Sequence, residues 1–290
     1  MIQDQLSIGV LGCGPIAQSA HFESCSKARN ARLYAICDRA PDLVARMAAI
    51  HQPEKTYADF GEMLTDPQID AVIIACADQF HVSLSIQALQ AKKHVLVEKP
   101  MGVSVEECEQ LARAVDDSGC KLQVGHMKRF DPGIAFAQQF IQEEMGQLLA
   151  LKAWYCDSTY RYTMTDNLQP LPIHSGNAHR PEGDPKRDKR KYFMLTHGSH
   201  LIDMARFLGG PVKAVRGRLK EFFGAYSWFV ELEFAAGGQG HLDLTIAVRM
   251  DYHEGFQIYG EHGSAIGKIY LPWFLKSSDV ECFSTRDGQY

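Results

Sequence analysis

The sequence predicts an α/β fold, in which an N-terminal doubly wound parallel sheet precedes a C-terminal α+β domain with a large, mostly antiparallel open sheet. Three observations lead to this prediction. Short apolar runs alternate with helical segments through the first part of the chain, which is typical of a parallel sheet with helical crossovers. A glycine-rich turn follows the first apolar run, and strand-like segments separated by glycines dominate the later part. We expect the two domains to comprise residues 1–123 and 124–290.

The glycine-rich turn is Gly-Cys-Gly-Pro-Ile-Ala at residues 12–17, between an expected strand at 6–11 and a helix expected to continue to about residue 28. Gly12 permits a tight turn, Gly14 lets the backbone approach a pyrophosphate, and Ala17 allows the helix to pack closely on the strand. The helix N-terminus offers free N–H groups and a positive dipole end to phosphates. The turn therefore favours a dinucleotide site, although alone it also occurs in other α/β domains.

An acidic residue, Asp38, ends the second expected strand at residues 32–37. A carboxylate at this position accepts hydrogen bonds from the adenosine ribose and repels a 2′-phosphate, so NAD is favoured and NADP is the alternative. Arg39 follows it directly. This arginine could stack on adenine, receive a 2′-phosphate if Asp38 turned away, or be a solvated loop charge.

The alternation continues to about residue 125. We expect helices at 40–50, 59–64, 82–91 and 104–118, and strands at 56–57, 71–75, 94–100 and 121–125. Ser104 and Glu107 form a capping-box pattern at the start of one of these helices.

The run His-Val-Leu-Val-Glu-Lys-Pro at residues 94–100 reads as a buried parallel strand whose carboxyl end delivers Lys99. Ligands of open α/β sheets bind beyond the carboxyl ends of the strands. A lysine there is a candidate proton carrier, because burial beside a cationic nicotinamide lowers the pKa of its amine. The alternative is an ordinary solvated lysine at a strand end.

In the second half, we expect helices at 131–144 and 192–208 and strands at 148–155, 212–222, 226–234, 239–248, 254–259 and 265–271. Leu242, Leu244 and Ile246 alternate with polar residues, which gives the sheet one buried and one polar face. Residues 157–191 are polar and without period. We expect a lid or a disordered loop here, with the candidate lid residues Tyr160, Arg161, Tyr162, His174 and His179.

Composition bounds the function. The formal net charge is −5 and the pI is about 6.2, so we expect no nucleic-acid or membrane partner. The N-terminus has no secretory pattern, and the eight scattered cysteines favour reduced thiols in a cytoplasmic protein. We expect no metal site, because His197 and His200 lack a third ligand at suitable spacing.

The combined motifs resemble the glucose–fructose oxidoreductase/inositol dehydrogenase (Gfo/Idh/MocA) family over roughly residues 5–270. The resemblance is carried by Gly9-x-x-Gly12-Cys13-Gly14-Pro15-Ile16-Ala17, Asp38, Glu98-Lys99-Pro100 and Gly198-x-His200-x-x-Asp203. It implies a Rossmann domain that binds NAD(P), and a C-terminal sheet that forms the substrate site and often the oligomer interface. It also implies hydride transfer between a sugar, polyol or glycoside hydroxyl carbon and the nicotinamide.

On this resemblance the catalytic residues are Lys99 and His200. The expected cofactor-binding residues are Gly12, Gly14, Pro15, Ile16, Asp38, Arg39, Ala75, Asp78, His81, Glu98 and Lys99. The expected substrate residues are Lys99, Arg129, Tyr155, Thr196, His197 and His200. Family members often have the peptide bond before the proline of Glu-Lys-Pro in cis.

The sequence departs from the family pattern in three places. Thr196 occupies the position where the family often has an aspartate, four residues before the histidine. The loop usually reading Thr-Pro-Asn-x-x-His is Cys76-Ala77-Asp78-x-x-His81. A returning C-terminal segment of the family is not expected in this sequence.

Two other functions remain compatible with these motifs. One is an NAD-dependent glycosidase that uses transient oxidation. The other is a non-catalytic nucleotide sensor, for which Thr196 is a weak argument and the presence of both Lys99 and His200 is a counter-argument.

Overall fold

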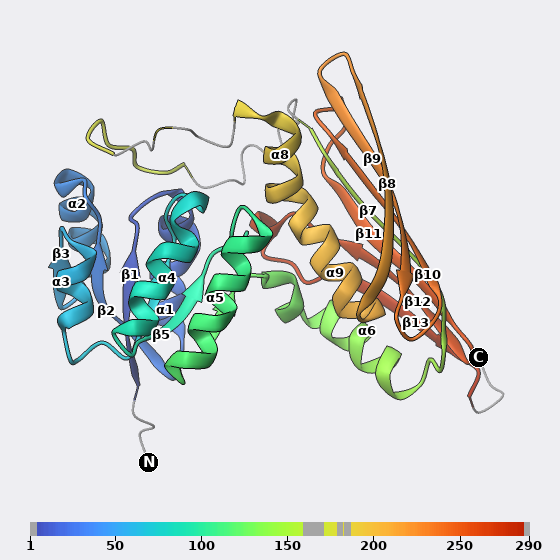
Figure 1. The fold of residues 1–290 in the computed structure, drawn as a ribbon, viewed down its shortest axis with the longest axis horizontal. Coiled ribbons are helices and arrows are strands. Elements are labelled where there is room, and N and C mark those ends of the chain that lie inside the picture. Colours follow the sequence, from blue (N-terminus) through green and yellow to red (C-terminus); the bar gives the residue numbers. More distant parts are fainter. Residues whose placement is uncertain (1–4, 159–170, 179–181, 183–186, 287–290) are drawn as a thin grey trace. The chain divides into compact units, whose positions relative to one another are not determined.

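A computed structural model describes residues 5–158, 171–178, 182 and 187–286 (Figure 1). Contacts divide these residues into two compact units. The first contains residues 5–125 together with 171–178, and the second contains 126–158 and 188–286. Of the expected lid residues, Tyr160, Arg161, Tyr162 and His179 lie outside the described residues, whereas His174 lies in the first unit.

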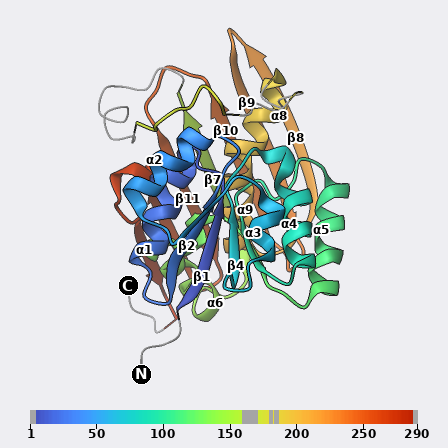
Figure 2. The same cartoon turned by 90° about the vertical axis from the view of Figure 1, so that its left-hand side faces the viewer.

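The first unit is built on a six-stranded parallel sheet in the order β3-β2-β1-β4-β5-β6, as the predicted doubly wound topology requires. Figure 2 labels its strands β2, β1 and β4. The strands are β1 (Leu6–Leu11), β2 (Ala31–Cys37), β3 (Lys55–Tyr57), β4 (Ala71–Ile74), β5 (His94–Val97) and β6 (Leu122–Val124). The helices are η1 (Ala17–His21), α1 (Phe22–Lys27), α2 (Pro41–His51), α3 (Phe60–Thr65), η2 (Asp78–Phe80), α4 (His81–Gln90) and α5 (Val105–Ser118).

Apolar side chains from both faces of this sheet pack under helices. Phe22 of α1 and Met47 of α2 pack with Val10 on one face, and Leu89 of α4 and Leu111 of α5 pack on the other. These positions follow the helical period of the sequence. Ser104 caps α5 by accepting a hydrogen bond from the N–H of Glu107.

The second unit has a seven-stranded sheet in the order β13-β12-β11-β7-β10-β9-β8, antiparallel except for the parallel pair β7 and β10. Its strands are β7 (Leu148–Asp157), β8 (Val212–Phe222), β9 (Ala225–Phe234), β10 (Gln239–Ile246), β11 (His253–Gly260), β12 (Gly263–Ile269) and β13 (Asp279–Ser284). Its helices are η3 (Met127–Phe130), α6 (Pro132–Glu143), α8 (Lys189–Phe193), η5 (Met194–Gly198), α9 (Ser199–Gly209) and η6 (Pro272–Phe274).

Helices cover one face of this sheet, where the predicted buried residues Leu242, Leu244 and Ile246 meet Leu201 and Met204 of α9. The predicted α+β domain with a large, mostly antiparallel open sheet is therefore confirmed. Strand β13 was not predicted, because its apolar residues alternate with exposed ones over only six residues. Among the described residues, none forms a helix long and apolar enough to span a membrane.

Candidate functional site

The glycine-rich turn of the first unit is fixed by close backbone packing. Gly12 has a φ of +98°, and a Cβ at this position would lie 2.5 Å from the carbonyl oxygen of Ala75. A side chain is therefore excluded by both backbone conformation and space. At Gly14, by contrast, a Cβ would meet no atom within 4 Å. The backbone here is open for close approach by a ligand, as a pyrophosphate site requires.

Helical residues follow this turn directly, beginning at Pro15 and Ile16 and continuing through η1 and α1. The first N–H groups of this helix have no partner from a preceding turn, so they face the turn with the positive end of the helix dipole. Residues 17–21 form a π-helical stretch. Such insertions occur frequently at functional sites.

Asp38 lies at the carboxyl end of β2 and is held by two backbone groups. Its Oδ2 accepts a hydrogen bond from the N–H of Cys13 at 2.8 Å, and its Oδ1 accepts one from the N–H of Ala40 at 2.9 Å. Each carboxylate oxygen retains further acceptor capacity. The carboxylate is thus fixed beside the glycine-rich turn and can still accept hydrogen bonds from the hydroxyl groups of a ribose. Arg39 is exposed.

The ends of the parallel strands bring these residues to one edge of the sheet. The backbone N–H of Gly12 donates a hydrogen bond to the carbonyl oxygen of Cys37 at the end of β2. In the same way, the N–H of Ala75 donates to the carbonyl of Leu11 at the end of β1, and the N–H of Glu98 donates to the carbonyl of Ile74 at the end of β4. Gly12, Asp38, Ala75 and Glu98 therefore follow neighbouring strands at the same carboxyl edge, where dinucleotides bind in such sheets. NAD fits this edge, because the turn has the required glycine geometry and is open at Gly14. A helix N-terminus and the fixed carboxylate of Asp38 also lie here.

Lys99 follows β5 at the same edge and is partly buried. Burial lowers the pKa of its amine, and the negative charges of Glu98 and Asp78 oppose that shift only in part. The pKa of Lys99 is consequently below that of an ordinary lysine. The Lys99–Pro100 peptide bond is cis.

Glu98 links the lysine segment to the helix after the glycine-rich turn. Its Oε1 lies 2.9 Å from Nε2 of His21, and its Oε2 accepts a hydrogen bond from the N–H of Lys99 at 3.1 Å. Burial raises the pKa of Glu98, but the hydrogen bond and charge of His21 together with Lys99 outweigh it, and the net shift is downward. Sequence reasoning did not identify His21.

His81 is buried, and its ring joins two loops. Nδ1 lies 2.7 Å from the carbonyl oxygen of Pro100, and Nε2 lies 3.2 Å from that of Cys76. This ring therefore holds the segment after Lys99 against the loop after β4. Its expected direct contact with a cofactor stays a prediction, as does that of Asp78 in the same loop.

In the second unit, the expected residue Tyr155 lies at the centre of an aromatic cluster. Its ring centroid lies 5.4 Å from that of His197 in an edge-on arrangement and 6.5 Å from that of His200 in a stacked one. The ring centroid of Tyr252 lies 5.4 Å from that of Tyr155, also in an edge-on arrangement. The structure thus brings Tyr155, His197 and His200 together, and their contact with a substrate stays a prediction.

A carboxylate from β7 reaches this cluster. Oδ2 of the buried Asp157 lies 3.4 Å from Nε2 of His197, and Nδ1 of the same ring lies 2.8 Å from the hydroxyl of Thr196. The Thr196 hydroxyl also donates to the carbonyl of Tyr192. Thr196 and His197 belong to η5, a second π-helical stretch. Sequence reasoning did not identify Asp157, which is the final residue of a strand and carries no local motif.

Arg129 is engaged in an ion pair. Its Nε and Nη2 atoms bond both carboxylate oxygens of Asp203 at 2.6 to 3.1 Å, which raises the pKa of Arg129. Its guanidinium also lies 5.1 Å from the ring centroid of Phe207. Asp203 is thus held by Arg129, and substrate binding by Arg129 stays a prediction.

A buried ion pair of Lys128 and Glu254 was not predicted. Both side chains are almost inaccessible, with 7% and 1% relative exposure, and Glu254 also accepts a hydrogen bond from Tyr252. The Lys128 amine lies 4.6 Å from the ring centroid of Tyr155. Burial and the charge of Glu254 raise the pKa of Tyr252 well above its usual value. Glu254 lies two and four residues before the buried Phe256 and Ile258, so the strand period places it on the same inward face.

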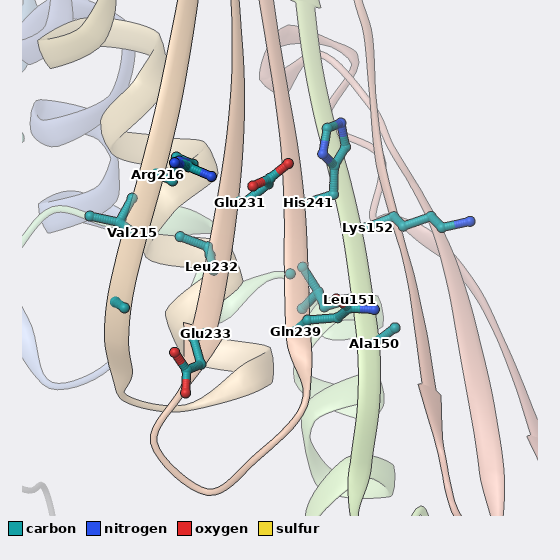
Figure 3. Close-up of a pocket in the computed structure, with 12 residues that line it drawn as sticks. Ala150, Leu151, Lys152, Val215, Arg216, Glu231, Leu232, Glu233, Gln239 and His241 are labelled. Carbon is teal, nitrogen blue, oxygen red and sulfur yellow. The ribbon is translucent and has the colours of Figure 1, made fainter.

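A pocket of about 640 Å³ lies on the sheet of the second unit (Figure 3). Its lining includes a cross-strand row of Arg216, Glu231, His241 and Lys152. These side chains alternate with those that pack under the helices, so the pocket is on the opposite face of the sheet. None of the expected site residues lines it.

All eight cysteines are free thiols. Burial raises the pKa of Cys37 to about 12 and that of Cys76 to about 12, so neither is a reactive thiolate at neutral pH. Within the described part of the chain, no three His, Cys, Asp or Glu side chains are grouped closely enough to hold a metal ion.

Comparison with known proteins matches both halves. A family model described as "Oxidoreductase family, NAD-binding Rossmann fold" matches residues 6–126, and a GFO/IDH/MocA C-terminal domain matches residues 144–266. Myo-inositol 2-dehydrogenase of Thermotoga maritima is 33% identical over 89% of this chain and 74% of its own. The scyllo-inositol 2-dehydrogenase (NAD(+)) of Bacillus subtilis is 25% identical over 91% of this chain and 74% of its own.

Among solved structures, the apo form of levoglucosan dehydrogenase superposes with a TM-score of 0.80 at 22% identity, covering 99% of this chain and 78% of that one. This likeness concerns the fold. The chain spans about three-quarters of the length of each of these three proteins.

Proposed function

Because the chain belongs to the GFO/IDH/MocA oxidoreductase family, with an NAD-binding Rossmann fold, we propose that it is an NAD-dependent dehydrogenase acting on a sugar, polyol or glycoside hydroxyl. Relatives named as inositol and levoglucosan dehydrogenases support this substrate class.

The observation that carries the proposal is the environment of Lys99. Its amine follows a buried parallel strand at the edge that also holds the glycine-rich turn and Asp38, and burial lowers its pKa. A lysine that loses its proton more readily is suited to accept one from an alcohol. An ordinary surface lysine would remain charged and could not serve as a base at neutral pH.

Bound NAD⁺ supplies the acceptor for the hydride that leaves the hydroxyl carbon. When that hydride leaves, the hydroxyl proton must also be removed, and the amine of Lys99 in its unprotonated form would accept it and become an ammonium. The Glu98 carboxylate holds the Lys99 backbone N–H, and His81 holds the carbonyl of Pro100. These bonds limit the movement of the lysine segment, so the amine needs little reorganisation before proton transfer.

The preference for NAD over NADP rests on Asp38. Its carboxylate is fixed by Cys13 and Ala40, so it is not free to turn away from a ribose. A 2′-phosphate would meet this negative charge. The exposed guanidinium of Arg39 remains available for stacking on adenine or for solvent.

For the second unit we propose that His200, with Tyr155, Thr196 and His197, contributes to the handling of the substrate. The rings of Tyr155 and His200 are stacked, and His197 is held between Asp157 and Thr196. An organised cluster of hydroxyl and imidazole groups suits recognition of a polyhydroxylated molecule.

The test is NADH formation, followed by its near-ultraviolet absorbance, with a panel of inositols, aldoses, anhydrosugars and glycosides. We expect turnover with at least one member and little with NADP⁺. Cleavage of a glycoside without net NADH would instead support the NAD-dependent glycosidase. Tight NAD binding without turnover of any kind would support the nucleotide sensor.

We further propose that the chain forms a homo-oligomer through the sheet face that carries the row Arg216, Glu231, His241 and Lys152. Helices α6 and α9 pack on the other face, whereas this row presents charges of both signs that a second copy can complement. Light scattering should report an oligomer that Glu231→Arg weakens. A monomeric unmodified protein would refute this. Cytoplasmic location and the lack of a nucleic-acid partner stay predictions from composition.

A further inference from the structure

Residues 171–178 are distant in sequence from the glycine-rich turn but belong to the same unit. Ile173 packs against the apolar cluster that contains Cys13, Phe22 and Val44. Its neighbours Leu171 and His174 are exposed. A packed Ile173 between exposed residues indicates a specific docking position on the first unit, although this part of the sequence has no secondary-structure period.

Gln18 provides the first polar attachment. Its side-chain amide forms two hydrogen bonds with the backbone of Ile173, donating to the carbonyl at 2.9 Å and accepting from the N–H at 2.8 Å. The same Nε2 also donates to the carbonyl of Cys13 at 2.8 Å. Cys13 in turn donates its N–H to Asp38. A continuous chain of hydrogen bonds therefore joins the segment to the glycine-rich turn and to the ribose-binding carboxylate.

Asp42, in the first turn of α2, provides the second attachment. Its Oδ1 accepts hydrogen bonds from the hydroxyl of Ser175 at 2.7 Å and from the side-chain amide of Asn177 at 3.2 Å. The N–H of Asn177 also donates to the Ser175 hydroxyl, so this turn is internally braced. The bond from Ser175 is the largest reason that the pKa of Asp42 lies below its usual value.

In the sequence, the two attachment residues Gln18 and Asp42 precede and follow the loop with Asp38 and Arg39, the proposed adenosine-binding loop. Gln18 is in the first turns of the helix after β1, and Asp42 is in the first turn of the helix after β2. Both helices begin at the carboxyl edge of the sheet, and the loop with Asp38 and Arg39 precedes α2. A segment attached to both helix starts borders the position of the adenosine ribose.

We propose that residues 171–178 complete the adenosine end of the dinucleotide site, so that docking of this segment and binding of the dinucleotide stabilise each other. This inference rests on NAD binding at the carboxyl edge. Such coupling is reciprocal, so a bound dinucleotide must stabilise the docked segment. Loosening the segment must then weaken the binding of the dinucleotide by the same factor.

Hydrogen exchange measures the first half of this coupling. Among the described residues, the N–H of Ile173 donates its hydrogen bond to the Gln18 side chain, so its exchange reports docking directly. Adding NAD⁺ or ADP-ribose should slow exchange of peptides that cover 171–178. If saturation of the protein with either compound leaves these peptides unchanged, the inference is wrong.

Binding titrations with two parts of the dinucleotide, ADP-ribose and reduced nicotinamide mononucleotide, measure the effect of the segment on dinucleotide affinity. The double variant Ser175→Ala with Asn177→Ala removes both bonds to Asp42 without touching the sheet or the glycine-rich turn. We expect its Kd for ADP-ribose to rise about tenfold, from the loss of two hydrogen bonds. The Kd for reduced nicotinamide mononucleotide, which has no adenosine, should change less than twofold by comparison.

Ser118→Ala is the matched control, because the Ser118 hydroxyl also accepts a backbone N–H bond and lies at the end of α5. It should leave both affinities unchanged. If the double variant binds ADP-ribose as the unmodified protein does, residues 171–178 are not part of the site although NAD binding stands. If the unmodified protein binds neither NAD⁺ nor ADP-ribose, the proposed function itself fails.

Discussion

The two units position their candidate functional side chains by different physical means. In the first, backbone geometry does so, since Gly12, Asp38 and Lys99 each follow a parallel strand whose end is fixed by the sheet. In the second, paired side chains from distant segments do so. Arg129 and Asp203 are 74 residues apart, and Lys128 and Glu254 are 126 residues apart. Sites of the first kind can be read from local motifs, whereas sites of the second kind depend on the folded sheet.

The units share one local device. Each carries a π-helical stretch at its candidate site, Ala17–His21 in the first and Met194–Gly198 in the second. The first contains His21, which bonds Glu98, and the second contains His197, which pairs with Asp157. A π-helical insertion shifts side chains relative to the regular helix, and here it accompanies a histidine that meets a carboxylate in both units.

The largest expected effect is that of Lys99→Ala. If the backbone of the first unit presents the base, removing the amine should reduce kcat about a thousandfold, which is within the range for loss of a general base. The Kd for NAD⁺ should stay within about twofold, because the remaining dinucleotide contacts are unchanged. Steady-state kinetics and a binding titration measure the two quantities.

Lys121→Ala is the control for this substitution, since Lys121 is exposed at the opposite end of the neighbouring strand β6. Its kcat should equal that of the unmodified protein. A Lys99→Ala protein that turns over normally would remove the amine from the mechanism.

Glu254→Gln probes the side-chain network of the second unit. It leaves the buried ammonium of Lys128 without its counter-charge, so we expect the free energy of unfolding to fall by about 3 kcal/mol. Chemical denaturation measures this value. Glu281→Gln, on the exposed side of β13, should change it by less than about 0.5 kcal/mol. Equal stability of both variants would mean that the ion pair does not organise this unit.

Asp38→Ala should have the smallest effect of the three. Loss of the ribose acceptor should weaken the binding of NAD⁺ about tenfold. The relative use of NADP⁺ should improve, because the negative charge that repels its 2′-phosphate is removed. Kinetics with both cofactors test this. Preference for NADP⁺ in the unmodified protein would contradict the ribose assignment.

Most of the first unit could be predicted because periodicity, glycine sterics and capping act over a few residues. The strand ends at Leu11, Cys37 and Val97 lie within a few residues of their predicted positions. The role of Gly12 follows from its conformation alone. Residue roles at this edge still require substitution, since folding places a side chain without assigning its chemistry.

The remainder depended on contacts that no local pattern encodes. Asp157 and Lys128 are recognisable only in the folded unit, where each meets a partner from a distant segment, His197 and Glu254 respectively. The two π-helical stretches were predicted as ordinary α-helix, because a π-helical turn changes the sequence period by only one residue. The docking of Ile173 on Gln18 joins positions 155 residues apart, in a segment predicted only as an irregular loop.

The most direct test of the account is the titration of the Lys99 amine itself. Lysine side chains labelled with ¹³C can be followed by NMR across pH, and the Lys99 signal assigned by its loss in Lys99→Arg. Burial at the end of β5 predicts a pKa below 10.5, the ordinary lysine value. A Lys99 signal that titrates at or above that value would contradict the claim that the strand end prepares this amine for proton transfer.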